Sequence, residues 1–222
     1  AAGTLSLVTE RPSFKGSRNW SMRTNINGGM FGLVSPSMMY AQKLGLRTVA
    51  SVYGKFTRAG GKYPFTLHNG KLRTREHRYN SDINAWRAEA NVYHTFVDSS
   101  RLEAKVNYYY SHRGLPGTVI LYANPSDERL WDEEFFAQAS YHRRLSEVLQ
   151  LVARFKYTHS WNRYRDWGSQ YAHGVRTDVN RQDEYYGSAT LGWNIVRGLD
   201  FALAEDLSHN VLKNNVYVNI SY

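Results

Sequence analysis

The chain has 222 residues, 42% hydrophobic and 14% aromatic, and its 28 Lys and Arg outnumber its 19 Asp and Glu, giving a formal net charge of +9. It has no cysteine, which excludes disulfides, thiolate metal sites and a cysteine nucleophile. The basic residues form no arginine-rich helix and no aromatic-basic platform, so we expect no nucleic-acid partner. The chain contains no run of about twenty apolar residues, which is the length that a membrane-spanning helix requires. The mean hydropathy of −0.57 fits a soluble domain or a β-barrel, because half of each barrel strand faces a polar lumen.

Alternation of apolar and polar residues is the strongest signal in the chain. In residues 101–112, every even position from Leu102 to Tyr110 is apolar, whereas most odd positions are charged or carry an amide. Residues 86–96 and 149–157 repeat the pattern. Because successive side chains of a strand point to opposite faces, each segment predicts a strand with one apolar and one polar face.

About ten such segments follow one another and predict an all-β protein. Pro36 lies inside the second segment, where it weakens the assignment or marks an irregular spot, because proline cannot donate a hydrogen bond to a neighbouring strand. We expect the strands at residues 19–26, 31–42, 46–58, 83–96, 101–112, 133–142, 148–160, 183–195, 199–207 and 215–222.

The connections between these segments alternate between short and long. Turns of a few residues are expected at 43–45, 98–100, 144–147 and 196–198, and long loops at 59–82, 113–131 and 161–182. Short turns on one side and long loops on the other are typical of an outer-membrane barrel. A soluble meander has no physical reason to sort its loops in this way.

Four segments resemble the TonB-dependent outer-membrane receptors. GTLSLVTERP at residues 3–12 is similar to the end of the family's plug domain, and NGGMFG at 27–32 to the tight turn between its first two barrel strands. SHRGLPG at 111–117 and ERLWDEEFFAQASY at 128–141 resemble vitamin B12 receptors of Bacteroidetes-type bacteria.

The resemblance implies an antiparallel transmembrane β-barrel of 22 strands around a plug, of which about ten strands are present. Residues 1–17 would be the C-terminal tail of the plug with its linker, and residues 18–222 the N-terminal portion of the barrel. The first residues lack the basic and apolar stretches of a secretory signal, so either a signal has been removed or the chain begins inside a longer one. We expect the second.

The function implied is energised uptake of a scarce large nutrient across the bacterial outer membrane, first of all vitamin B12 or another corrinoid. An iron chelate or an oligosaccharide is the alternative ligand. Implied partners are the TonB complex, outer-membrane lipid and lipopolysaccharide, a surface lipoprotein lid and the small-molecule ligand. A small passive barrel or porin is the second reading, and a soluble sugar-binding β-domain the third.

Two sets of residues are candidates for this function. The residues of the first set would line the lumen and pair with the plug. The alternative is that they line the lumen and are only solvated or paired with one another. The members of this set are Arg47, Lys55, Arg87, Glu89, Glu103, Lys105, Arg154 and Lys156. The second offers flat rings to a macrocycle or sugar from the loops, or else anchors those loops. Its members are Tyr63, Tyr79, Tyr122, Trp161, Tyr164, Trp167 and Tyr171.

No pattern in the chain indicates catalysis or a cofactor. The eight histidines have no ligand spacing, and no nucleophile motif is present. We therefore expect no enzyme, no cofactor and no metal site, although the carboxylates at 132–134 and 178–184 leave calcium binding open.

The first prediction concerns the size of the native polypeptide. A plug inside 22 strands requires a chain roughly three times the 25.6 kDa of this sequence. We expect that mass for the polypeptide purified from outer membranes, measured by intact mass spectrometry. A mass near 25.6 kDa would instead favour the small passive barrel.

Overall fold

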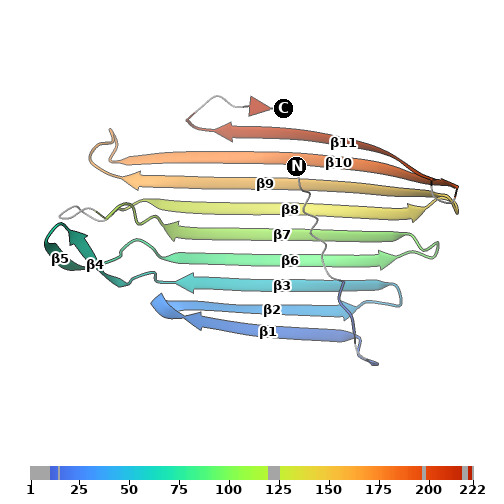
Figure 1. Ribbon diagram of the computed structural model, residues 1–222, viewed down its shortest axis with the longest axis horizontal. Coiled ribbons are helices and arrows are strands. Elements are labelled where there is room, and N and C mark those ends of the chain that lie inside the picture. The colour runs from blue at the N-terminus through green and yellow to red at the C-terminus, as the bar shows by residue number, and fades with distance from the viewer. Residues whose placement is uncertain (1–10, 15, 120–125, 197–198, 217–219, 222) are drawn as a thin grey trace.

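The computed structural model describes residues 11–14, 16–119, 126–196, 199–216 and 220–221. These residues form twelve strands and one short 3-10 helix, η1 (Figure 1). No helix among them is long and apolar enough to cross a membrane. The elements are β1 (Trp20–Gly29), η1 (Met30–Gly32), β2 (Leu33–Lys43), β3 (Thr48–Ala59), β4 (Pro64–Asn69), β5 (Leu72–His77), β6 (Ile83–Thr95), β7 (Arg101–Gly114), β8 (Arg129–Arg144), β9 (Leu149–Trp167), β10 (Val175–Val196), β11 (Leu199–Asn214) and β12 (Ile220–Ser221).

Ten of the strands form one antiparallel sheet in which neighbours in sequence are neighbours in space. Only β4 and β5 leave this order, as a separate hairpin inserted between β3 and β6. The short turns lie at the right-hand end of the sheet in Figure 1, and the hairpin and the long connections at the left-hand end. The predicted all-β antiparallel fold is therefore confirmed, and we name these the short-turn end and the long-connection end.

The loop predicted at residues 161–182 is wrong, and the one predicted at 59–82 contains the β4–β5 hairpin. Residues 161–182 are mostly strand, because β9 continues to Trp167 and β10 begins at Val175, and the two pair along this whole stretch. The connection that remains is residues 168–174. The apolar alternation that marks a strand stops near Tyr157, but backbone hydrogen bonds continue the pairing beyond it with polar side chains.

The two faces of the sheet differ sharply in composition and in exposure. The polar face carries every buried side chain of the described strands: Ser35, Ala41, Val49, Ser51, Ala85, Asn91, Tyr93, Asn107, Ser111 and Thr158. The apolar face is exposed, with Trp86 55%, Trp193 47% and Leu203 65% accessible. No second layer covers it among the described elements. The apolar face is therefore the exposed one, which is the reverse of the arrangement in a soluble protein.

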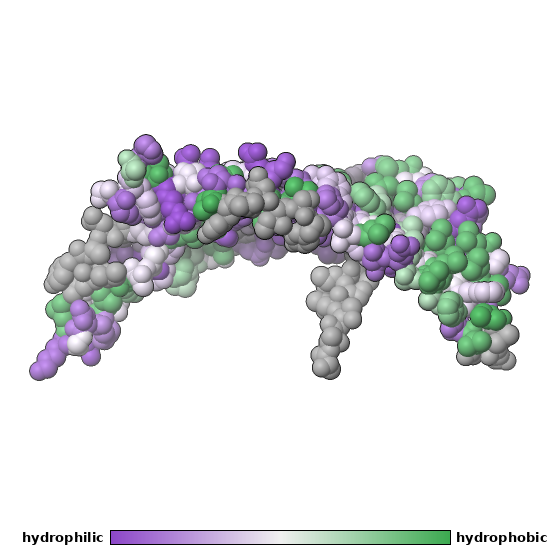
Figure 2. Space-filling view, turned by 90° about the horizontal axis from the view of Figure 1, so that it is seen from above, coloured by the Kyte–Doolittle hydropathy of each residue, from purple (hydrophilic) through white to green (hydrophobic). Residues whose placement is uncertain are grey.

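Figure 2 shows the sheet from the side of β11 as an arch. Hydrophobic residues gather over its right-hand end, where β11 begins, and hydrophilic residues predominate along its middle. Along β11 the apolar face carries Leu199, Phe201, Leu203 and Leu207, all more than half exposed at 53%, 58%, 65% and 68%.

Aromatic rings border the apolar face at both ends. Towards the long-connection end, ring centroids lie 4.3 Å apart for Phe56 and Trp86 and 5.0 Å apart for Tyr157 and Tyr185. Towards the short-turn end, Phe96 lies 6.2 Å from Tyr141. Trp86 and Phe96 are separated by about ten residues, or roughly 33 Å of extended backbone. Tilted strands of that length span an apolar band about 25 Å tall, as in outer-membrane barrels.

The predicted irregularity at Pro36 is confirmed. The pairing of β2 with β3 skips Ser35 and Pro36, and the side chains of Ser35 and Thr57 bond across the gap at 2.9 Å. Because proline has no N–H group, it cannot complete that part of the ladder.

The turn predicted between the first two strands is also present, as η1. Phe31 there has a φ of 62°, which is rare for a residue with a side chain. Its carbonyl accepts hydrogen bonds from the backbone N–H groups of Gly60 and Gly61 at 3.0 and 3.2 Å, and its ring lies 5.0 Å from that of Tyr63. The turn is thus fastened to the connection that follows β3.

The two faces generate the second prediction. Thr190 lies on the polar face of β10 and Leu191 on the apolar face. We expect Leu191→Arg to lower the free energy of unfolding in phospholipid vesicles by about 2–4 kcal/mol, because it places a charge in hydrocarbon. The matched change Thr190→Arg faces polar surroundings and should cost much less. If urea unfolding shows that the two variants lose the same free energy of unfolding, this assignment of the faces is contradicted.

Candidate functional site

The polar face is hollowed between β6 and β10, over a volume of about 490 Å³. Four cationic side chains line the hollow, from Arg101, Lys105, Arg154 and Lys156, against one carboxylate from Glu103. Four of the predicted lumen residues therefore meet here. The predominance of cations suits an anionic group, whether on a ligand or on another part of the protein.

Contacts within the face hold several of these charges in place. Lys105 forms an ion pair with Glu89 on the neighbouring strand at 2.9 Å. The ammonium groups of Lys105 and Lys156 lie 5.9 and 5.2 Å from the centre of the Phe136 ring. Such contacts fix the cations against the sheet while leaving them accessible from the hollow.

The other predicted lumen residues divide into two groups. Lys55 and Arg87 are paired across β3 and β6 on the polar face, and the Arg87 guanidinium lies 5.5 Å from the Tyr109 ring. Arg47, expected in a strand, lies instead in the turn before β3, where its carbonyl accepts a hydrogen bond from Thr95 at 2.9 Å. It therefore belongs to the short-turn end.

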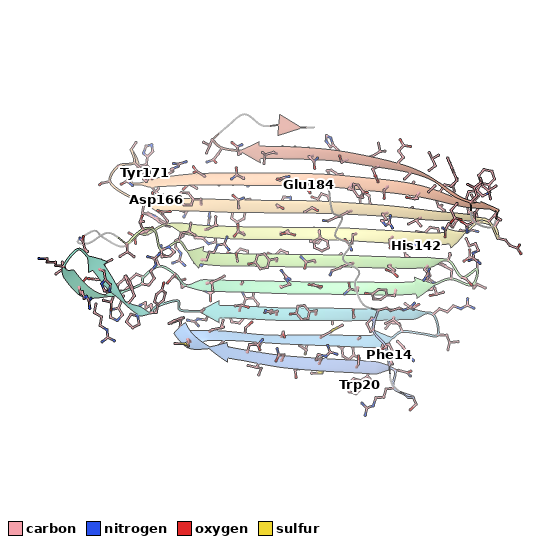
Figure 3. The ribbon with its side chains drawn as sticks, in the orientation of Figure 1. Phe14, Trp20, His142, Asp166, Tyr171 and Glu184 are labelled. Carbon is pink, nitrogen blue, oxygen red and sulfur yellow. The ribbon has the colours of Figure 1, made fainter. Side chains whose placement is uncertain are left out.

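Residues 11–14 approach the same face. The Arg11 guanidinium lies 5.9 Å from the centre of the Tyr93 ring, which is only 4% exposed, and Lys43 lies 5.1 Å from the Phe14 ring. Phe14 and His142 both lie towards the short-turn end (Figure 3). Residues 1–10, which carry most of the plug-end resemblance, are outside the described residues.

Three of the predicted loop aromatics lie in connections at the long-connection end. Tyr63 packs near Phe65 at 6.3 Å, and Lys62 lies 5.9 Å from the Tyr79 ring. Tyr171 donates a hydrogen bond of 2.5 Å to Asp166, and the two lie together in Figure 3. That bond raises the pKa of the Tyr171 phenol. Tyr122 is outside the described residues.

The loop assignment of Trp161, Tyr164 and Trp167 is wrong, because all three lie in β9. The strand alternates, so Tyr164 lies on the polar side and both tryptophans on the opposite side, away from the hollow. Arg163 and Arg165, which lie between the two tryptophans on the same side of β9, are charged, so this part of the strand lacks the apolar alternation that predicts a strand.

A polar cluster that the sequence did not indicate joins two of the long connections. The Arg129 guanidinium bonds both oxygens of Asp82 at 2.7 and 3.2 Å and also reaches Nε2 of His112 at 2.9 Å. Asn80 donates to the carbonyls of Leu115 and Glu128 at 3.1 and 2.7 Å. Residues far apart in sequence meet here only because β6, β7 and β8 are adjacent, so no local motif could reveal the cluster.

The electrostatics of Asp82 follow from this environment. Burial alone would raise the pKa of the carboxyl, but the hydrogen bonds and positive charge of Arg129 outweigh it and hold the pKa below its ordinary value. The Asp82 carboxylate therefore stays charged and keeps the two connections tied to the start of β8.

The clustered carboxylates form no metal site in the described part of the chain. Asp132 pairs with Arg113 on the polar face at 2.9 Å, whereas Glu133 projects to the apolar side. Adjacent residues of a strand cannot converge on one ion, and this also separates Asp183 from Glu184.

Comparison with known proteins agrees on the fold and goes no further. No protein-family model matches the chain, and no curated protein matches it. Among solved structures it is similar to the siderophore receptor PiuA from Acinetobacter baumannii, with a TM-score of 0.64 and 9% identity over 90% of this chain. The chain spans 31% of the length of that receptor. At this level of identity the likeness establishes a shared fold.

The third prediction concerns the Asp82–Arg129 pair. Their side chains are 34% and 23% exposed, so we expect a coupling energy of about 0.5–1 kcal/mol between Asp82→Asn and Arg129→Gln. Because the folded pKa of Asp82 is lowered, this stability is present above about pH 4 and is lost as the pH falls through the folded pKa. Unfolding of the double-mutant cycle at pH 7 and pH 3 measures both.

The control for this prediction is Arg75→Gln, on the exposed side of the β4–β5 hairpin. It should leave the pH dependence unchanged. If Arg129→Gln behaves in the same way as the control, the pair contributes nothing.

Proposed function

We propose that this chain forms part of the transmembrane barrel of a TonB-dependent receptor in the bacterial outer membrane, which takes up a scarce large nutrient. The observation that carries the proposal is the contrast between the faces. A single layer of strands separates an uncovered apolar band, bordered by aromatic rings, from a hollowed and charged face. Lipid on one side and a polar interior on the other satisfy both faces.

The open edges of the sheet support a place in a larger barrel. Among the described strands, β1 pairs only with β2, and β12 only with β11. Unpaired backbone groups in hydrocarbon cost several kcal/mol each, so an open sheet cannot persist there. In this proposal, residues 1–17 are the tail and linker of a plug, residues 18–222 are barrel, and further strands close it.

Several features support a receptor over a passive pore. The hollow carries four cations, residues 11–14 lie against the polar face, and Tyr63, Tyr79 and Tyr171 stand at the long-connection end. Rings at the mouth and cations below suit a large ligand with anionic groups. Energy would come through the TonB complex, and a surface lipoprotein could cover the mouth.

Two ligand classes have support of different kinds. The segments at 111–117 and 128–141 resemble corrinoid receptors, whereas the solved structure similar to this chain is described as a siderophore receptor. We rank a corrinoid and an iron chelate equally as candidate ligands, and an oligosaccharide below them.

The fourth prediction tests ligand binding by the native full-length protein in detergent. We expect saturable binding of either cyanocobalamin or a ferric siderophore in a fluorescence titration. Tyr63→Ala and Tyr79→Ala should each weaken binding about tenfold, since a lost aromatic contact costs on the order of 1–2 kcal/mol.

Tyr40→Ala is the matched control, because Tyr40 lies on the apolar face near Trp20 and cannot touch such a ligand. Absence of saturable binding by either ligand and by oligosaccharides would overturn the receptor and favour a passive barrel. Equal effects of all three substitutions would overturn the role of the two rings.

A further inference from the structure

A cationic and aromatic surface lies on the same side of the sheet as the apolar face. It begins beyond the aromatic border at the long-connection end. It continues the outward positions of β7 to β10, where His112 is paired with Trp131, Trp131 with Arg163, and Trp161 with Arg181. Arg165 follows on β9. We call these six residues the outer basic patch. None of them can face the hollow, because they project to the opposite side of the strands.

Contacts with indole rings hold Arg163 and Arg165 in the outer basic patch. The Trp131 ring lies between His112, stacked at 4.8 Å with an interplanar angle of 15°, and the Arg163 guanidinium at 4.2 Å. Arg163 also lies 5.5 Å from Trp161, and Arg165 lies 6.0 Å from Trp131. A cation–π contact of this kind positions a guanidinium without using its N–H groups as hydrogen-bond donors.

The positive charge of the patch is not neutralised within the described part of the chain. Arg163, Arg165 and Arg181 take part in none of its ion pairs. The Nε atoms of Arg163 and Arg165 are buried, so the terminal nitrogens of these two side chains are the donors that a ligand can reach. Asp183 is occupied by His159 at 2.7 Å and by Tyr157 at 2.8 Å. Three guanidinium groups thus have unused donor capacity, against a single nearby carboxylate that is not ion-paired, that of Glu133.

An open hollow of about 320 Å³ lies at the edge of the patch, lined by Glu133, His159, Trp161 and Arg181. It sits directly beyond Tyr157 and Tyr185, whose rings border the apolar face. If that face meets lipid acyl chains, the hollow and the patch lie at the depth of the lipid headgroups.

The two ends of the apolar face differ in charge. Among the described strands, the outward arginine at the short-turn end is Arg143, and it is paired with Asp98 at 3.5 Å. On the side of the apolar face, among the described strands, the arginines without an ion pair therefore lie at the long-connection end, which faces outside in an outer-membrane barrel. The lipid that carries phosphate in that leaflet is the phosphorylated glycolipid lipid A.

We propose that the outer basic patch binds the phosphate groups of lipid A, with Arg163 and Arg165 as the principal donors. This inference rests on the proposed membrane barrel. A guanidinium donates two parallel hydrogen bonds to a phosphate, and the stacked geometry presents two such groups side by side. The acyl chains would then lie along the apolar face below the patch.

The experiment uses the native full-length protein in detergent and measures the affinity for bisphosphorylated lipid A by native mass spectrometry. The variant is Arg163→Gln with Arg165→Gln. The control, Arg73→Gln with Arg75→Gln, removes the same charge from the exposed β4–β5 hairpin at the same end of the molecule. Dephosphorylated lipid A and phosphatidylglycerol are measured on the wild-type protein.

We expect lipid A to bind at least about tenfold more weakly to the variant, since it loses two groups that donate charge-assisted hydrogen bonds to phosphate. The control should bind as the wild type does. Dephosphorylated lipid A should lose a similar factor on the wild-type protein, and this measurement does not depend on the folding of a variant.

Each other outcome overturns a defined part of the argument. Equal affinity for phosphorylated and dephosphorylated lipid A, or equal losses in the two double variants, would overturn the patch as a phosphate site and leave the membrane barrel intact. Equal binding of phosphatidylglycerol would overturn the assignment to lipid A. A protein that stays monodisperse without detergent would overturn the proposed function itself, and the patch with it.

Discussion

The structure depends on one constraint, that a single layer of backbone must satisfy two different solvents. Between the two edges of the sheet, each strand pairs its N–H and C=O groups with both neighbours. Side chains therefore make most of the contact with the surroundings, and they alternate with a period of two. Residues such as Glu103 and Lys105 therefore share one face, while Leu102 and Val106 share the other. A shift of one residue in any register would exchange the two sets, so the register is fixed along the whole sheet.

The same constraint explains which elements the sequence could predict. Where outward positions are apolar, as in β6 and β7, the alternation placed the strand starts at Ile83 and Arg101, where the structure has them. Where outward positions are polar, as at Arg163 and Arg181, the pairing continues but the contrast is lost. The sequence therefore predicts a loop at residues 161–182, although β9 continues to Trp167 and β10 begins at Val175.

Side-chain direction limits what could be predicted about the candidate site. Alternation placed Lys105 and Arg154 on one face, and the structure brings both into the hollow. Trp161 and Trp167 were grouped with Tyr164 by their aromatic character alone, although a strand separates them to opposite sides. The cluster of Asn80, Asp82 and Arg129 joins segments nearly fifty residues apart, and neither composition nor spacing carries that information.

The two ends of the sheet have different physical tasks, and their side chains differ accordingly. At the short-turn end a few residues reverse the chain, and Asp98 accepts hydrogen bonds from both the backbone and the hydroxyl of Ser100, at 3.1 and 2.6 Å, to close one such turn. At the long-connection end the strands run past the aromatic border, and polar contacts such as Asp82 with Arg129 replace the apolar ones. The part of β9 beyond the aromatic border carries Arg163 and Arg165 on the side of the apolar face and Tyr164 on the polar side. It can therefore contact two partners at once. In a membrane barrel those partners are the lipid headgroups around it and the ligand above its mouth.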